Sequence, residues 1–169
     1  MVLNCIISKE CYIKEREFTM TGHYTRQFHE LFDRLFELFE QSSLTEIVYE
    51  RVPIGTAARF ARNVGDYDIY ESMSTDTLLS IAEAFDVIYG YKRKSESLAV
   101  KANTLVKEIH KDVLKVRHKD LMDHSQCGRS TISKFRTLND GENYIIRNLI
   151  DLGNTSRDLQ SKGEVEGVH

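Results

Sequence analysis

Hydrophobic residues recur at helical spacing along most of this chain. Over residues 25–41 they follow one another three and four positions apart, which places them on one broad face of a helix. This stripe consists of Phe28, Leu31, Phe32, Leu35, Phe36, Leu38 and Phe39. Such a face either packs against the core of its own domain or forms a dimer interface, and the spacing is consistent with both interpretations.

The same periodicity predicts three shorter helices in the first half of the chain. They cover residues 45–52, 56–63 and 77–87. A turn at Pro53-Ile54-Gly55 separates the first two, and an Asp- and Tyr-rich loop over 65–72 precedes the third. The run Ser74-Thr75-Asp76 is typical of residues that cap the start of a helix.

The longest predicted helix covers residues 98–118. Its apolar positions repeat about every 3.5 residues, which is typical of a coiled-coil seam or of a stripe that faces a core. These positions are Leu98, Ala102, Leu105, Ile109, Val113 and Val116. Lysines at 107, 111 and 115 stand four residues apart and therefore line one side of the helix.

Together these elements predict a mainly α fold with two small helix-turn-helix-like halves. The first half takes up residues 1–90, and a basic linker at 91–97 connects it to a second half at 98–153 that begins with the long helix. Residues 154–169 are polar and predict a flexible tail. Near the start, β-branched residues in 2–13 favour a short N-terminal β-hairpin.

Charge is distributed unevenly along the chain. The net charge is −3 overall, but residues 91–136 hold 12 basic and 5 acidic side chains, a net charge of +7. Residues 1–90 hold 8 basic and 15 acidic side chains, a net charge of −7. A local excess of positive charge attracts phosphate more than the chain total suggests. A solvated, lysine-rich helix would give the same count, so charge alone leaves two interpretations.

Residues 119–136, KDLMDHSQCGRSTISKFR, satisfy the physical demands of a helix-turn-helix. Leu121 and Met122 supply the apolar face of a first helix. Cys127 supplies a small residue to fill the corner, where Gly128 would relax the backbone. The second helix then begins with either Gly128 or Ser130 as its cap.

The second helix of this motif combines a buried face with a donor-rich face. Ile132 and Phe135 lie one turn apart and would pack against the first helix. Short hydroxyl side chains and arginine contact phosphates and base edges, and residues 129–136 contain no carboxylate. The predicted DNA-contacting residues are Arg129, Ser130, Thr131, Ser133, Lys134, Arg136, Lys119 and Lys115. Further phosphate contacts are expected from Lys92, Arg93 and Lys94.

The run Arg129-Ser130-Thr131-Ile132-Ser133-Lys134-Phe135 resembles the lambda-repressor/Cro-like (Xre-family) helix-turn-helix DNA-binding proteins, whose second helix typically reads SRSTISRIE. The resemblance covers residues 119–152, including a further helix predicted over 142–152. Met122 and Gln126 stand where the family usually has alanine and glycine. The resemblance implies that the hydroxyl and basic side chains face DNA.

Residues 44–87 resemble the same family more distantly. A helix, the turn at Pro53, a second helix and the segment 76–87 follow one another in the family's order, with a few extra residues between start and finish. This segment lies in the acidic half. We therefore interpret it as a degenerate copy, or as one used for assembly.

Other chemistry has little support in the sequence. His118, His124 and Cys127 lie close together, but a structural zinc site needs a fourth ligand. The sequence contains no glycine-rich phosphate loop and no hydrolase or metalloprotease motif, so we expect no enzymatic activity, metal or cofactor. Three cysteines without a disulfide pattern, and no long apolar run, favour a cytoplasmic protein that does not enter a membrane.

These observations favour a DNA-binding transcriptional regulator, such as a repressor, that reads the major groove of double-stranded DNA as a homodimer. The dimer would form through residues 28–39 or 98–116. The alternative is a protein–protein interaction module, antitoxin-like or inhibitory, without enzymatic activity. Binding to RNA is disfavoured, because few aromatic residues lie beside the basic segment for base stacking.

Overall fold

A computed structural model describes residues 22–138 and 143–166 of the chain. Within these ranges the protein is mainly α, as predicted, and its β-structure is limited to an isolated bridge between Ser74 and Ile145. The predicted N-terminal β-hairpin lies outside the described residues.

The helices form two units that repeat one order, in which a long opening helix is followed by a short one, a nine-residue one and a closing one. Among the described residues, the first unit has a further five-residue helix before its closing helix. The first unit contains α2 (His23–Gln41), α3 (Leu44–Tyr49), α4 (Ile54–Arg62), α5 (Tyr67–Glu71) and α6 (Thr75–Tyr89). The second unit contains α7 (Leu98–Leu114), α8 (His118–His124), α9 (Arg129–Thr137) and α10 (Ile146–Glu166).

Local caps explain where several of these helices begin and where α6 ends. Ser43 and Glu46 form a reciprocal capping box at the start of α3. The side chain of Ser74 accepts a hydrogen bond from the backbone N–H of Thr77 over 3.2 Å and caps α6, as its sequence predicts. Gly90 ends α6 in the left-handed conformation, with φ of 69°.

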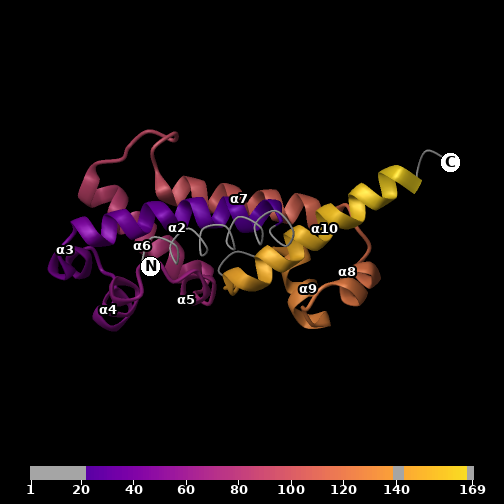
Figure 1. Cartoon of the computed structure of the whole chain (residues 1–169), viewed down its shortest axis with the longest axis horizontal. Helices are drawn as coiled ribbons and strands as arrows, with labels where there is room; N and C mark the ends of the chain where they lie inside the picture. The colour runs from indigo at the N-terminus through magenta and orange to yellow at the C-terminus, as the bar shows by residue number, and fades with distance from the viewer. Residues whose placement is uncertain (1–21, 139–142, 167–169) are drawn as a thin grey trace, which may run out of the picture.

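The helices that open the two units, α2 and α7, lie side by side through the middle of the molecule (Figure 1). The phenylalanine-rich stripe of α2 faces this interior, and all seven of its residues are buried. The interpretation as a core stripe is therefore confirmed. The stripe is not available as a dimer interface, because the chain covers it with its own helices.

The apolar stripe of α7 is likewise part of the core. Leu98, Ala102, Leu105, Ile109 and Val113 are all buried, and Val116 is half-buried. Dimerisation through this seam is also excluded, for the same reason. The helix ends at Leu114 rather than at 118, because the chain turns at 115–117 before α8 begins.

Two regions expected to lack regular structure are helical. The loop predicted over 65–72 contains α5, which begins where the Asp66 carboxylate accepts a hydrogen bond from the Ile69 N–H over 3.2 Å. The tail predicted from residue 154 continues α10 to Glu166. Ser156 is fully buried there, and its hydroxyl donates to the Leu152 carbonyl over 2.7 Å.

One hydrophobic cluster extends through both units. It joins residues of α2, α4, α6, α7, α9 and α10, and it does not divide at the basic segment 91–97. The predicted halves are therefore recognisable by helix order but share a core. None of the helices in the described part of the chain has the length and hydrophobicity of a membrane span.

Candidate nucleic-acid interface

The chain folds α8 and α9 into a bihelical corner where the sequence predicts one. Residues 125–128 connect the helices, so no single helix runs through Cys127. Leu121 of α8 and both Ile132 and Phe135 of α9 have no exposed surface. These three predicted core positions fix which side of α9 remains outside. Met122, which was expected to face inward, is instead 43% exposed.

Gly128 occupies the N-cap of α9, which is one of the two caps predicted. Its φ of −78° and ψ of 164° are extended values that other residues adopt, and an added Cβ would meet nothing within 4 Å. The backbone at this corner therefore does not require glycine, contrary to the sequence-based expectation.

Cys127 packs against the core at the corner between the two helices. Its Sγ lies 3.6 Å from the Asn148 carbonyl oxygen and 3.6 Å from a carboxylate oxygen of Asp151. Burial, with a smaller effect of the Asp151 charge, raises the pKa of this thiol to about 12. The thiol is thus neutral at physiological pH. Among the residues described, no three histidine, cysteine or acidic side chains are grouped to hold a metal ion.

Contacts on the inner side of α9 fix its position. The Phe135 ring packs edge-on against the Tyr144 ring, with centroids 5.2 Å apart, and against the His110 ring of α7 at 5.6 Å. The Tyr144 hydroxyl donates to the Lys134 carbonyl over 3.0 Å. His110 Nε2 lies 2.9 Å from the Arg136 carbonyl oxygen. The helix is held from behind by α7 and by the segment that enters α10.

The outer side of α9 carries most of the residues predicted to contact DNA. Arg129, Ser130, Ser133 and Lys134 are exposed, and Thr131 is half-buried. The helix contains no carboxylate. Its first turn receives no side-chain cap from the residues that the structure describes, so these backbone N–H groups remain free to bind an anion.

Lys115 and Lys119 flank this corner and are both exposed. Lys115 lies in the turn after α7, where its Nζ is 4.0 Å from a carboxylate oxygen of Asp112. Arg117, in the same turn, forms an ion pair with Asp120 over 3.1 Å. The corner therefore offers two exposed lysines beside α9, of which Lys115 is in a long ion pair with Asp112, and an arginine that is paired with Asp120.

Arg136 has a different position from the one predicted. Its Nη1 donates to the Val113 carbonyl over 3.1 Å and to the Val116 carbonyl over 2.8 Å. The Val113 carbonyl belongs to the last turn of α7 and the Val116 carbonyl to the turn that follows it. Cations are favoured at this end of a helix by its dipole. We therefore assign Arg136 a structural role, in which it holds α9 against the end of α7, and remove it from the residues predicted to contact DNA.

The basic residues Lys92, Arg93 and Lys94 do not join the corner. They belong to the loop between α6 and α7, which lies at the upper edge of the molecule in Figure 1, whereas α4 and α9 lie at the lower edge. A duplex seated on α9 would not reach this loop at the same time. The predicted phosphate contacts of these three residues are thus not supported by their placement.

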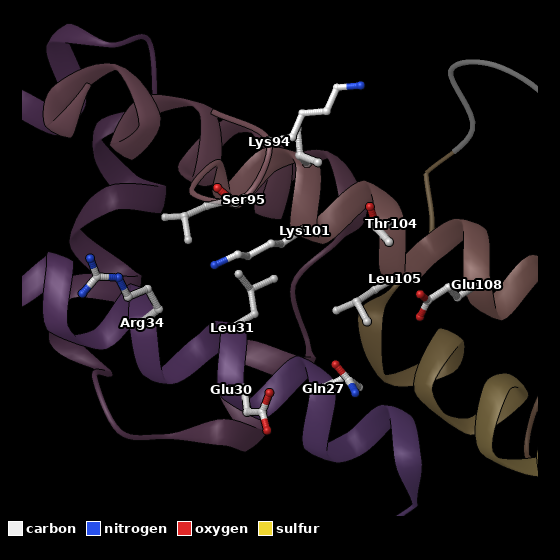
Figure 2. Close-up of a pocket in the computed structure, with 12 residues that line it drawn as sticks. Gln27, Glu30, Leu31, Arg34, Lys94, Ser95, Lys101, Thr104, Leu105 and Glu108 are labelled. Atoms are coloured by element: carbon white, nitrogen blue, oxygen red, sulfur yellow. The ribbon is translucent and has the colours of Figure 1, made fainter. Parts of the chain in front are cut away.

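A groove of about 460 Å³ lies between α2 and α7. Figure 2 shows Leu31 and Leu105 facing one another in it, with charged side chains around them. The lining contains charges of both signs, from Arg34, Lys94 and Lys101 and from Glu30 and Glu108. This mixed lining is less suited to a polyanion than a surface that carries only basic and hydroxyl side chains.

No protein-family model matches the chain, and comparisons with curated proteins and with solved structures found no significant match. The resemblance to the lambda-repressor/Cro-like family therefore rests on residues 119–152 themselves.

Proposed function

We propose that this protein binds double-stranded DNA, with α9 in the major groove. The observation that carries the proposal is the α8–α9 corner. Leu121, Ile132 and Phe135 are buried, and the opposite side of α9 presents hydroxyl and basic side chains without a carboxylate. A recognition helix needs this combination of a fixed inner face and a donor-rich outer face.

The contacts fall into two kinds. Arg129, at the first position of α9, has the reach and donor geometry to pair with guanine, and Ser133 has a short donor for base edges. Lys134 and the neighbouring Lys115 and Lys119 supply phosphate contacts, which give affinity but little sequence information. Occupation of such a site next to a promoter would make the protein a transcriptional regulator.

Fluorescence anisotropy with a labelled mixed-sequence duplex about three helical turns long tests this proposal. The double variant Arg129→Ala/Lys134→Ala should bind at least about tenfold more weakly than the unmodified chain, with a shallower dependence on salt. Arg93→Ala/Lys94→Ala removes the same charge from the opposite edge and is the matched control. It should keep its affinity within about twofold.

Two outcomes would overturn the proposal. One is affinity that barely changes between low and high salt, because phosphate contacts release counterions. The other is an equal loss of affinity in both double variants, which would show that binding depends on the net charge of the chain and not on the residues of α9. Circular dichroism of each variant establishes that the loss does not come from unfolding.

A further inference from the structure

The two nine-residue helices, α4 and α9, occupy equivalent places in their units. Each buries the residues at its fourth and seventh positions, which are Ala57 and Phe60 in α4 and Ile132 and Phe135 in α9. The preceding short helices agree in the same way. Ile47 is the fourth residue of α3 and Leu121 the fourth of α8, and both are buried.

The support behind the two helices is also repeated. The Tyr70 ring packs edge-on against Phe60 with centroids 5.1 Å apart, and the Tyr144 ring packs on Phe135 in the same manner at 5.2 Å. The Tyr70 hydroxyl donates to the Phe60 carbonyl over 2.7 Å, as the Tyr144 hydroxyl does to a carbonyl of α9. Both helices are therefore fixed from behind by a tyrosine that precedes the closing helix.

Contacts between the units are reciprocal. The closing helix α6 packs against α7, and the closing helix α10 packs against α2. Asp86 of α6 accepts hydrogen bonds from the Leu98 and Ala99 N–H groups at the start of α7, over 2.8 and 3.2 Å. Asn154 of α10 accepts from the Tyr24 N–H at the start of α2, over 3.0 Å. Each unit thus caps the long helix of the other.

An antiparallel bridge joins the two segments that lead into the closing helices. The Thr75 N–H donates to the Tyr144 carbonyl over 2.7 Å, and the Ile146 N–H donates to the Met73 carbonyl over 3.0 Å. Such a reciprocal pair has a local twofold axis. The bridge therefore lies where an approximate twofold axis would relate the units. In Figure 1, α4 of the first unit and α9 of the second lie on the same edge of the molecule.

From this arrangement we infer that one copy of the chain binds DNA as two half-sites of unlike sequence, with α4 in one stretch of major groove and α9 in the next. The inference rests on the proposed DNA binding by α9. Dimeric helix-turn-helix proteins place two recognition helices on one face of the duplex, a helical turn or a multiple of it apart. Here a single chain supplies both helices.

The outer face of α4 suits a duplex, although its residues differ from those of α9. Both helices have threonine at the third position and a basic residue at the sixth, which are Thr56 and Arg59 in α4. Arg59 and Arg62 are exposed, and α4 contains no carboxylate. Ile54 at the first position is 65% exposed and has an apolar surface of the kind that contacts a thymine methyl group. Because the two faces differ, the preferred site should not be a palindrome.

The experiment starts with selection of duplexes from a random library by the unmodified chain, followed by native mass spectrometry of the complex. We expect one copy of the chain per duplex and two unlike sequence blocks about one helical turn, or a multiple of it, apart. Removing either block should weaken binding at least about tenfold. Arg59→Ala/Arg62→Ala should weaken binding to the selected duplex to a similar extent, while the control Arg93→Ala/Lys94→Ala should not.

The outcomes separate this inference from the proposed function. Either of two results would overturn the inference and leave the binding by α9 intact. The first is two copies of the chain on a palindromic duplex. The second is full affinity of Arg59→Ala/Arg62→Ala under conditions in which Arg129→Ala/Lys134→Ala loses affinity. An α4 face that serves a protein partner would give this second result. A chain that enriches no duplex at all would overturn both. The block-removal experiment uses the unmodified chain, so misfolding of a variant cannot obscure the answer.

Discussion

The Tyr144 hydroxyl donates a hydrogen bond to the backbone carbonyl of Lys134 over 3.0 Å, while the side chain of Lys134 is exposed on the other side of α9. One residue thus links the supported side of the helix with its candidate DNA-binding side. The hydroxyl and the ring of Tyr144 hold the helix from within, which leaves the exposed side chains free to meet a ligand.

Tyr144→Phe removes this hydrogen bond and keeps the ring packed against Phe135. We expect the free energy of unfolding to fall by about 1 kcal/mol, the usual contribution of one such bond. Urea denaturation followed by circular dichroism measures it. Tyr49→Phe is the control, because Tyr49 is 83% exposed. Equal stability of the Tyr144 and Tyr49 variants would contradict the role given to Tyr144.

Phe135→Ala should destabilise the fold far more than a change on the outer side of α9. The ring is fully buried between α7 and Tyr144, so its removal leaves a cavity and costs about 3–5 kcal/mol. Ser133→Ala, on the exposed side, should change the stability by less than about 0.5 kcal/mol. Thermal and urea unfolding of both variants provide the comparison, and a large effect of Ser133→Ala would show that this side is covered.

Arg136→Gln tests the assignment of Arg136 to structural support. The change removes the charged donor from the Val113 and Val116 carbonyls, and we expect a loss of about 1–2 kcal/mol in the free energy of unfolding. Under conditions in which the variant is folded, its affinity for the mixed-sequence duplex should fall less than that of Arg129→Gln. The reverse order of affinities would return Arg136 to the residues predicted to contact DNA.

The Cys127 thiol should react slowly and with a shifted pH dependence. Burial raises its pKa from 9.0 to about 12, so the reactive thiolate stays scarce until the solution is strongly alkaline. In a chain that carries Cys5→Ser and Cys11→Ser, the rate of alkylation by iodoacetamide should still rise above pH 9. The urea-unfolded chain should reach half of its maximal rate near that pH, because its thiol has the ordinary pKa of 9.0. A half-maximal rate near pH 9 in the folded chain would contradict this expectation.

The same pKa difference predicts how stability depends on pH. Between pH 9 and 12 the unfolded chain releases the thiol proton and the folded chain keeps it. The unfolded state then binds fewer protons, so Cys127 makes the free energy of unfolding decrease as pH rises through this window. In the Cys127→Ser variant this contribution should be absent, and its stability should fall less steeply over the same range.

Asp86→Ala should weaken the start of α7. The carboxylate accepts from two backbone N–H groups of α7 and from the Ser97 hydroxyl, which is 2.6 Å away. We expect a loss of about 1–2 kcal/mol, typical of a removed N-terminal cap. Differential scanning calorimetry measures the change, and Glu83→Ala on the exposed side of α6 is the control. Equal melting temperatures would contradict the capping role.

The helix-turn-helix corner was predictable from the sequence because its requirements are local. Ile132 and Phe135 stand three residues apart with Cys127 shortly before them, and this spacing alone places a buried side on one helix. The predictions for α2 and α6 succeeded for the same reason, since their apolar residues repeat over several turns. The bounds of these helices differ from the predicted ones by at most two residues.

The features of the fold and of the candidate site that the sequence did not predict depend on contacts between distant parts of the chain. The segment after residue 153 is polar in sequence but continues α10, which packs against α2. At Gly153 the two helices approach so closely that an added Cβ would lie 2.5 Å from the Tyr24 ring. The acceptors of Arg136 are one carbonyl at the end of α7 and one in the turn after it, 23 and 20 residues away. Local sequence contains no signal for either contact. The equivalence of Tyr70 behind α4 and Tyr144 behind α9 also depends on tertiary contacts, because it consists in the packing of each tyrosine ring on a phenylalanine of the helix in front of it.

Amide chemical shifts of the ¹⁵N-labelled chain, recorded while a mixed-sequence duplex is added, test the central claim most directly. If α9 enters the major groove, the largest changes should fall on residues 129–137 and on the turn before them, and high salt should reverse them. If the amides of α9 stay unchanged while those of another surface shift, or if no amide responds to the duplex, α9 is not a recognition helix.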